Sequence, residues 1–556
     1  MEITVAQAII KFLQEEGVEV IFGYPGGAVI AFYDALYDSS LKHVLVRHEQ
    51  GAAHAADGYA RSSGKVGVCV ATSGPGATNL VTGLATAFMD SSPVIAITGQ
   101  VRTTVLGKDS FQEADITGIT MPITKHNYLV KDPEKVLTIF KEAFYIATTG
   151  RKGPVLIDIP ADIFMAKINY RYPSNINLPG YKPNYEPHPL QIKKAVGLIK
   201  SAERPVILAG GGVISSNASY ELIKFAEKIN TPVVTTLMGK GAIPEDHHLY
   251  CGFIGMHGAA YANFTINNSD LIIAIGVRFS DRSTGRVDTF APHAKIIHID
   301  IDPAEIGKNV EPYIPIVADA KIALQRLIQE VEEKNNPSWW ERIKEWKEKY
   351  PLKYKNQEGV IKPQYVVEKI YEITKGSAIV VTEVGQNQMW AAQFYKVKYP
   401  RQFITSGGLG TMGFGLPAAI GAQIANPDKL VIDIAGDGSI QMNIQELATA
   451  VTQRLPIKIF ILNNSCLGMV RQWQELFYKK RYSCTLLDIA PNFVKLAEAY
   501  GAYGRRVENP EEVEDAIYWA LEKKDAPAIV DFKVVREENV FPMVPAGGSI
   551  DKMMID

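Results

Sequence analysis

Short runs of β-branched and other apolar residues recur along the whole chain, and many of them are followed by a turn and a helix-like segment. Runs that are largely apolar are typical of strands buried on both faces of a parallel sheet. Strand–helix alternation of this kind predicts an α/β architecture of doubly wound parallel sheets. Representative runs are Val66–Ala71, Val94–Thr98, Val155–Ile159, Val206–Leu208, Leu271–Ile275, Ile296–Ile299, Ile379–Thr382, Leu430–Ile434, Ile457–Leu462 and Ala528–Phe532.

Two segments interrupt this alternation and divide the chain of 556 residues. Asn169–Pro189 is rich in proline, asparagine and tyrosine, as expected of a linker. Glu330–Lys362 is dense in charge and holds three tryptophans, which predicts a solvated helix with an aromatic anchor, followed by a second linker. We therefore expect three domains, over residues 1–168, 190–335 and 362–556, of which the first and third are candidates for distant copies of one fold.

Composition argues against several functions. The 58 Lys and Arg residues nearly balance the 60 Asp and Glu residues, and no basic patch is visible, which argues against binding to nucleic acid or an anionic membrane. The uncharged stretches Val66–Met89 and Gln402–Pro427 are interrupted by glycine, proline and polar residues, so neither is expected to span a membrane. No signal peptide is read, and the four cysteines form no CxxC pair, so we expect a cytoplasmic protein.

The most informative segment joins two apolar strands, one running into a Gly-Asp-Gly turn at Asp437 and the next into an Asn-Asn pair ending at Asn464. The interval contains a predicted helix, Asn443–Gln453. A right-handed βαβ crossover would bring Asp437 and Asn464 together at the carboxyl edge of the sheet. One carboxylate and one amide oxygen, completed by phosphate oxygens, suit Mg²⁺, and the glycines and the helix N-terminus that follow suit a phosphate.

This pair of motifs resembles that of thiamine-diphosphate (ThDP) enzymes, and the chain is similar from end to end to the large catalytic subunit of the acetohydroxyacid synthase (acetolactate synthase) family. The block Gly407–Ala419 is especially close. The resemblance implies ThDP, Mg²⁺ and FAD as cofactors, with a pyrimidine-binding first domain, an FAD-associated central domain and a third domain that binds the diphosphate and the metal. It also implies decarboxylation of pyruvate and transfer of a hydroxyethyl unit to a second pyruvate or to 2-oxobutyrate, the first common step of branched-chain amino acid biosynthesis.

Glu49 stands between an apolar strand and an alanine-rich helix. A carboxyl group at this place is consistent with a tuned proton affinity, although a favourable charge at a helix N-terminus would look the same. The resemblance implies that Glu49 shares a proton with the aminopyrimidine ring of ThDP. It also implies that Glu49 and the Asp437 site come from different subunits, so that the active site lies at the interface of a homodimer or homotetramer.

Further cofactor contacts are implied by the resemblance alone. The main-chain carbonyl of Cys466 is expected to be a third metal ligand, and Met412 is expected to bend the coenzyme. Asn387 stands where family members usually carry histidine, and its amide can still donate to a phosphate oxygen. The expected ThDP-binding residues are Glu49, Val384, Gly385, Gln386, Asn387, Gly410, Met412, Gly438, Ser439 and Met469.

A strand that ends in three glycines at Gly210–Gly212 is a weak signal of a dinucleotide site, because tight turns look the same. The resemblance strengthens it, since an Arg-Phe-x-Asp-Arg stretch marks the FAD-containing biosynthetic enzymes of the family. Ser280 replaces the usual aspartate there, a mild departure. The expected FAD-binding residues are Arg151, Gly210, Gly211, Thr236, Leu237, His257, Gly276, Arg278, Asp281, Arg282, Asp300, Ile301, Asp319 and Ala320.

Met469 and Trp473 are four residues apart, which places them on one face of a helix. Such a pair could line a substrate site or simply pack in the core. The resemblance implies that Trp473 selects 2-oxobutyrate over pyruvate as the acceptor. Gly27, Gln112 and Lys125 also correspond to active-site positions, and the tail Phe541–Ser549 resembles an arm that closes over the site.

Two other functions remain open at this point. A flavin oxidoreductase of the pyruvate-oxidase type would share the fold and both organic cofactors, but would form acetate or acetyl phosphate. A catalytically silent flavin-binding scaffold is a second alternative, which the presence of Glu49, Asp437 and Asn464 disfavours. The sequence leaves undecided whether a small regulatory subunit binds, which amino acid inhibits, and whether the assembly is a dimer or a tetramer.

Overall fold

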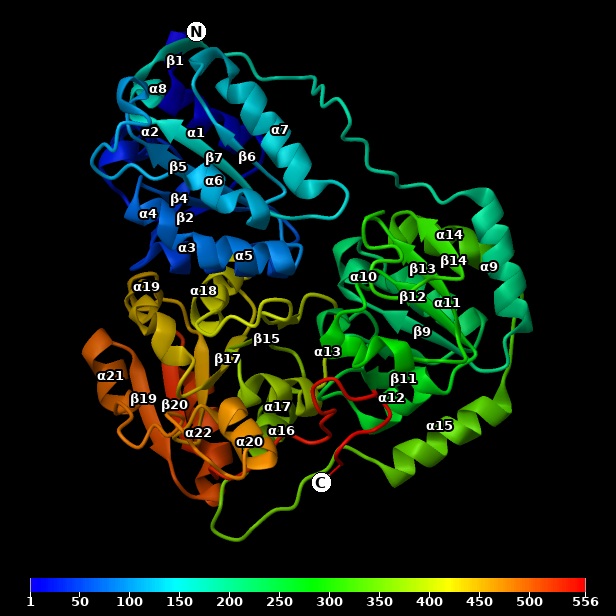
Figure 1. Cartoon of the computed structure of the whole chain (residues 1–556). Helices are drawn as coiled ribbons and strands as arrows, with labels where there is room; N and C mark the ends of the chain where they lie inside the picture. The colour runs from blue at the N-terminus through cyan, green and yellow to red at the C-terminus, as the bar shows by residue number, and fades with distance from the viewer. Residues whose placement is uncertain (1, 556) are drawn as a thin grey trace.

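Three six-stranded parallel sheets form the framework of this computed structural model, which describes residues 2–555. Each sheet belongs to its own third of the chain, coloured blue to cyan, green, and yellow to red in Figure 1. A short antiparallel pair, β1 (Glu2–Thr4) with β8 (Lys167–Asn169), joins the two ends of the first third. The predicted doubly wound α/β architecture is therefore confirmed.

The first sheet has the order β3 (Lys42–Leu45), β2 (Val20–Gly23), β4 (Gly67–Ala71), β5 (Val94–Gln100), β7 (Val155–Pro160), β6 (His126–Leu129). One face packs against α1 (Val5–Glu15), α2 (Ile30–Tyr37) and α7 (Val136–Thr148), and the other against α3 (Glu49–Ser63) and α5 (Val81–Met89). Alternate residues of β4 point to opposite faces: Val68 and Val70 pack on one side of the sheet, and Cys69 and Ala71 pack on the other. This double burial explains the uniformly apolar strands.

The third sheet has the order β16 (Phe403–Ile404), β15 (Ile379–Thr382), β17 (Val431–Gly436), β18 (Lys458–Asn463), β20 (Ala528–Lys533), β19 (Tyr503–Val507). Counted along the chain, this is the same succession of strands as in the first sheet. The shared topology supports the hypothesis that the first and third domains are copies of one fold. The covering helices are α16 (Pro363–Thr374), α17 (Gln386–Phe394) and α22 (Val513–Glu522) on one face, and α18 (Gly415–Ala425), α19 (Leu447–Thr452) and α21 (Phe493–Tyr500) on the other.

The central sheet has the order β11 (Tyr250–Phe253), β10 (Val233–Thr235), β9 (Pro205–Ala209), β12 (Leu271–Ile275), β13 (Lys295–Asp300), β14 (Ile314–Val317). Two strand series run outward from β9 and β12, as in dinucleotide-binding sheets, where the ligand binds at the point of reversal. The covering helices are α9 (Pro189–Ser201), α11 (Ser219–Lys228) and α14 (Ala320–Glu330) on one face, and α12 (Ala260–Asn267) and α15 (Pro337–Lys349) on the other.

Both segments that interrupt the alternation have the structure expected of them. The polypeptide between β8 and α9 forms neither helix nor strand and runs along the outside of the molecule (Figure 1). The charged segment forms α15, whose buried Trp339 donates its indole N–H to the carbonyl oxygen of Pro205 at 3.0 Å. This bond and the apolar contacts of Trp339 anchor an otherwise polar helix to the central sheet.

The predicted helix Asn443–Gln453 is wrong in its first turn. A 3-10 helix, η7 (Ile440–Glu446), precedes α19, and Asn443 inside it has the non-helical angles φ −134° and ψ 31°. The side chain of Asn443 donates a 2.7 Å hydrogen bond to the carbonyl oxygen of Gly413. This contact with a distant loop overrides the local helical preference.

The first and third domains touch through the packing of α3 on α18. The central domain lies beside both, and the C-terminal tail crosses between it and the third domain (Figure 1). None of the helices between Glu2 and Ile555 is long and apolar enough to cross a lipid bilayer.

Candidate active site

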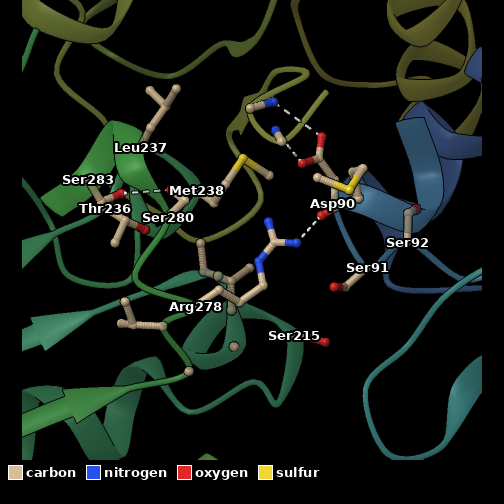
Figure 2. A pocket seen from close by; sticks show the side chains of 18 of the residues that line it. Asp90, Ser91, Ser92, Ser215, Thr236, Leu237, Met238, Arg278, Ser280 and Ser283 are labelled. Atoms are coloured by element: carbon tan, nitrogen blue, oxygen red, sulfur yellow. Dashed lines mark hydrogen bonds between the residues drawn. The ribbon is translucent and has the colours of Figure 1, made fainter. Parts of the chain in front are cut away.

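A cavity of about 1050 Å³ lies where the three domains meet. Figure 2 shows part of its wall, with Asp90 and Ser91 from the first domain facing Thr236, Met238 and Arg278 from the central domain. The third domain completes the lining. The predicted site residues that line it are Arg151, Gly211, Thr236, Leu237, His257, Gly276, Arg278, Asp281, Arg282, Asp300, Ile301, Asp319, Ala320, Val384, Gly385, Gly410, Met412, Met469 and Trp473.

Asp437 and Asn464 follow neighbouring strands of the third sheet. Gly436 in β17 is paired with Leu462 in β18, so both side chains lie at the carboxyl edge, as predicted from the crossover. Asp437 is buried, and its Oδ2 atom has no hydrogen-bond partner among residues 2–555. Burial raises the pKa of its carboxyl group to about 7. A buried carboxyl oxygen left without a partner is a ready ligand for a cation.

Hydrogen bonds fix the orientation of the Asn464 amide. Its Nδ2 donates to Oε1 of Gln386 at 3.0 Å, and its Oδ1 accepts the main-chain N–H of Cys466 at 3.2 Å. Gln386 is held in turn, because its Nε2 donates to Oε1 of Gln472 at 2.9 Å. The Cys466 thiol is buried, which raises its pKa to about 11 and keeps it neutral.

The loop between β15 and α17 carries Gly385, and Asn387 lies in the first turn of α17. Gly385 has φ 150°, a conformation that favours glycine, and it lines the cavity. Asn387 lies beneath this loop, with Nδ2 donating to the carbonyl oxygens of Glu383 at 3.1 Å and Ile434 at 2.9 Å. Both amide hydrogens are thereby used within the chain, so in this arrangement Asn387 braces the loop.

The turn after Asp437 lies close to Met412. A Cβ added to Gly438 would meet the Cε atom of Met412 at 3.9 Å and Cδ2 of Leu467 at 2.8 Å, so a larger residue at position 438 would crowd this edge. The Oγ atom of Ser439 lies 3.3 Å from both the N and the O of Gly436, which tightens the turn. These contacts connect the Asp437 edge to the cavity wall.

Gly27, Glu49 and Gln112 follow strands β2, β3 and β5, so all three lie on the carboxyl side of the first sheet. Glu49 begins α3, and its Oε2 accepts the amide N–H of Asn79 at 2.9 Å. A Cβ on Gly74 would meet the carbonyl oxygen of Gln112 at 2.8 Å, and Gly27 lies in the exposed turn after β2. Within the described chain, none of these three lines the cavity, whereas Met412 and Met469 do.

Lys125 occupies a different environment. Its Nζ donates to the carbonyl oxygens of Thr149 at 2.8 Å and of Ile146, and to the hydroxyl of Tyr181 at 2.9 Å. Burial lowers the pKa of Lys125 to about 8. The structure therefore places this amine against the linker that carries Tyr181 and outside the cavity wall.

The central domain presents its glycines at the point where the strand order reverses. A Cβ on Gly210 would meet the carbonyl oxygen of Gly276 at 2.1 Å, so β9 and β12 end in touching turns that only glycine permits. Burial raises the pKa of Asp300 to about 6 and also raises that of Asp319, which caps α14. Arg151 crosses from the first domain and pairs with Glu305 at 2.7 Å.

Met469 and Trp473 lie on α20 (Gly468–Phe477), and both line the cavity, so the predicted common face is confirmed. The guanidinium of Arg282 stands 5.9 Å from the ring centroid of Trp473. The indole nitrogen of Trp473 is buried and has no hydrogen-bond partner in the part of the chain that the structure describes.

The C-terminal tail packs beside the cavity. Val544 N donates to the carbonyl oxygen of Met256 at 2.8 Å, and Val540 N donates to Oε1 of Gln472 at 2.8 Å. Nδ1 of His257 lies 3.2 Å from the carbonyl oxygen of Pro542, and burial lowers the pKa of His257 to about 4. The tail thus bridges α20 and the central domain.

The charged residues of the cavity wall that sequence reasoning missed include Arg61 and Asp90. Asp90 ends the uncharged stretch Val66–Met89, and a charge at that place is a signal that could have been followed. Their pairing across helices could not be inferred from spacing.

Comparison with known proteins matches a part of each third of the chain to a domain of one family. Models of the thiamine pyrophosphate enzyme family match in chain order, with the N-terminal TPP binding domain over residues 3–119, the central domain over 192–327 and the C-terminal TPP binding domain over 383–532.

Individual relatives agree over nearly the full length. A probable acetolactate synthase large subunit of Methanocaldococcus jannaschii is 54% identical, with 99% of this chain and 95% of the relative covered. An acetolactate synthase of Mycobacterium bovis is 52% identical over 99% and 91%, and an acetolactate synthase large subunit of Buchnera aphidicola is 49% identical over 99% and 98%. The chain belongs to the acetolactate synthase large-subunit family of thiamine pyrophosphate enzymes.

Proposed function

We propose that this chain is the catalytic subunit of an acetolactate synthase. It decarboxylates pyruvate and transfers the remaining hydroxyethyl unit to a second pyruvate, giving 2-acetolactate, or to 2-oxobutyrate, giving 2-aceto-2-hydroxybutyrate. When bound, thiamine diphosphate supplies the electron sink for the loss of CO₂. The observation that carries the proposal is the buried pair Asp437 and Asn464 at the sheet edge next to Met412.

Magnesium fits this edge. The unpartnered carboxyl oxygen of Asp437, the oriented amide oxygen of Asn464 and the main-chain carbonyl of Cys466 would hold it, all of them hard oxygen ligands. A divalent cation would also compensate the buried charge of Asp437. Val384, Gly385, Gln386, Gly410, Gly438 and Ser439 are the proposed surroundings of the diphosphate, with Asn387 bracing the loop beneath it.

We assign residues 1–168 to pyrimidine binding, 190–335 to the flavin-associated domain and 362–556 to diphosphate and metal binding. Glu49 holds the proton that the aminopyrimidine ring needs, and Asn79 orients its carboxyl group. Glu49 is absent from the cavity wall that Met412 lines, which supports the proposal that the partner subunit of a homodimer or homotetramer supplies it. Gly27 and Gln112, on the same sheet edge, would then face the substrate, whereas the Lys125 amine is engaged by the linker that carries Tyr181.

FAD fits the central part of the cavity. The volume of about 1050 Å³ exceeds that of most small-ligand pockets and leaves room for a dinucleotide. The glycine turns at Gly211 and Gly276 would admit its diphosphate, and Arg278 and Arg151 would offset its charge. The other predicted contacts are Gly210, Thr236, Leu237, His257, Asp281, Arg282, Asp300, Ile301, Asp319 and Ala320.

Met469 and Trp473 are proposed to shape the acceptor site. The large indole restricts the space left for the acceptor, and its partnership with Arg282 places a positive charge near a 2-oxo acid carboxylate. Because relatives are named as large subunits, we expect a small regulatory subunit to bind. The cysteines are free thiols, and three of the four are buried, which fits a cytoplasmic location.

The test is incubation of the purified protein with ThDP, Mg²⁺, FAD, pyruvate and 2-oxobutyrate, followed by mass spectrometry of the products. We expect both acetohydroxy acids. Acetate or acetyl phosphate with bleaching of the flavin would indicate an oxidase of the pyruvate-oxidase type. If pyruvate is not consumed, the chain is a silent flavin-binding scaffold and the proposal is wrong.

A further inference from the structure

The glycine-rich segment Gly407–Met412 is held by a helix of another domain. The segment lies in the wall of the cavity, and none of its residues forms a helix or a strand. Its position therefore depends on side-chain contacts and on packing. Asp90, at the end of α5, accepts the main-chain N–H of Gly407 at 3.2 Å through Oδ2 and that of Gly408 at 2.7 Å through Oδ1.

The segment Gly407–Met412 passes so close to the end of α5 that only glycine fits at position 408. A Cβ there would lie 2.7 Å from Oδ1 of Asp90 and 3.0 Å from Cβ of Met89. Figure 2 shows the carboxyl group of Asp90 with both of these hydrogen bonds drawn. Any larger residue at 408 would push the segment away from α5.

A largely buried arginine, Arg61, fixes the carboxyl group of Asp90. Nη2 of Arg61 lies 2.8 Å from Oδ2 of Asp90, and the Asp90 side chain is fully buried. Arg61 is itself held by Asp57 through two bonds of 2.7 and 2.9 Å, and its Nη1 donates to the carbonyl oxygen of Thr405 at 2.7 Å. Charge-assisted bonds in a buried site are strong and geometrically specific.

The other end of the segment is tied to the same helix. Thr86 and Asp90 are four residues apart on α5 and lie on one face of it. The hydroxyl groups of Thr86 and Thr411 are 2.7 Å apart, and both residues are buried. Since the Thr86 hydroxyl donates to the carbonyl oxygen of Thr82 at 2.9 Å, the hydroxyl of Thr411 is the donor in the pair. Met412 is the next residue.

The central domain also braces this helix end. Nη1 of Arg278 donates to the carbonyl oxygen of Met89, and the two regions face each other in Figure 2. The turn at Met89 and Asp90 thereby contacts all three domains.

We propose that Asp90 and Thr86 are positioning residues that clamp Gly407–Thr411 and so set the place of Met412 against the coenzyme. The part played by Met412 rests on the proposed function, whereas the clamp is a property of the chain alone. Two hydrogen bonds at one end of the segment and one at the other define its path across the cavity wall.

The experiment is hydrogen–deuterium exchange of cofactor-free protein, read on the peptide that covers residues 403–414. The variants are Asp90→Asn, Asp90→Ala and Thr86→Val, with Thr86→Ser as the conservative rescue and Asp57→Asn as the matched control. Asp57 shares Arg61 and full burial with Asp90 but makes no bond to Gly407 or Gly408 in the described structure.

We expect both Asp90 variants to speed exchange of this peptide about tenfold, and Thr86→Val to speed it about threefold, because each leaves local amides less protected. Thr86→Ser should return it to the wild-type rate, and Asp57→Asn should change it less than Asp90→Asn. In the loaded enzyme, kcat should be lower in the variants whose exchange is faster, while KM for pyruvate changes little.

Equal acceleration by Asp57→Asn and Asp90→Asn would overturn the proposal, because the ion network would then be acting only as general support. Unchanged exchange in Asp90→Ala would overturn it as well. If Asp90→Ala does not fold, the comparison of Thr86→Val with Thr86→Ser still decides. If the variants exchange faster but the wild-type protein forms no acetohydroxy acid, the clamp is supported and the proposed function is contradicted.

Discussion

The amide of Asn464 donates its N–H to Gln386 at 3.0 Å, and this bond decides which end of the amide is oxygen. Gln386 is fixed by Gln472 on α20, the helix that carries Met469 and Trp473. The metal edge and the acceptor pocket are therefore joined through two side-chain amides. A change in this chain of bonds is expected to affect both coenzyme binding and product choice.

Replacing Asp437 by Asn should separate stability from binding. The carboxyl group is buried and lacks a partner for one oxygen among residues 2–555, so a neutral amide of the same shape relieves a desolvation penalty. We expect metal-free Asp437→Asn to be as stable as the wild type or more so, by about 1–3 kcal/mol at pH 8. Its affinity for ThDP in the presence of Mg²⁺ should fall by about 100-fold. Thermal unfolding tests the expected stability and calorimetry tests the expected loss of ThDP affinity, with the exposed Asp288→Asn as control. A destabilised variant that binds ThDP normally would contradict both expectations.

Mixing two inactive variants should restore activity if the site is shared between subunits. Glu49→Gln removes the proton-holding carboxyl, and Asp437→Ala removes the metal ligand. In a mixed dimer both lesions fall in one site and leave the other intact, so roughly a quarter of wild-type activity should return after subunit exchange. Absence of any recovery, with heterodimers demonstrated by native mass spectrometry, would place both residues in one protomer.

Trp473→Leu should change the products more than the stability. The side chain lines the cavity, and its indole N–H has no partner in the described chain, so its loss opens space next to Met469 without breaking a hydrogen bond. We expect the ratio of 2-aceto-2-hydroxybutyrate to 2-acetolactate, at equal substrate concentrations, to fall about tenfold. Val470→Leu, on the exposed side of α20, is the control. An unchanged ratio would remove Trp473 from the acceptor site.

A buried pair of carboxyl groups should make stability depend on pH. A Cβ on Gly415 would meet both Asp433, at Oδ1, and Glu383, at Cγ, and neither oxygen of Asp433 has a partner within residues 2–555. Burial raises the pKa of both groups. Because the folded state favours their protonated forms, their stabilising contribution is complete below the usual pKa of about 4 and is lost as pH rises towards the raised values.

Asp433→Asn is neutral throughout and should become more stable relative to wild type as pH rises from about 5 to about 8. Urea unfolding of cofactor-free protein at the two pH values measures the trend. Asp288→Asn serves again as the exposed control. A stability difference that does not vary with pH would mean that folding does not raise the pKa of either carboxyl group.

Much of this architecture could be predicted because its cause is local. Uniformly apolar runs such as Leu271–Ile275 are strands buried on both faces, and the crossover rule placed Asp437 beside Asn464 at one edge. The remainder depends on contacts between distant residues. Asn443 departs from the helix because of Gly413, and Asp90 meets Gly408 across 318 positions of sequence. Periodicity carries no information about such pairs.

The central claim is that Asp437 and Asn464 hold a divalent ion that anchors a diphosphate coenzyme. Isothermal titration of the metal-stripped protein with thiamine diphosphate, with and without Mg²⁺, tests it most directly. We predict saturable binding with Mg²⁺ and a loss of about 100-fold or more in affinity with a chelator. Coenzyme binding that is equally tight without the metal, or no binding under either condition, would contradict the account.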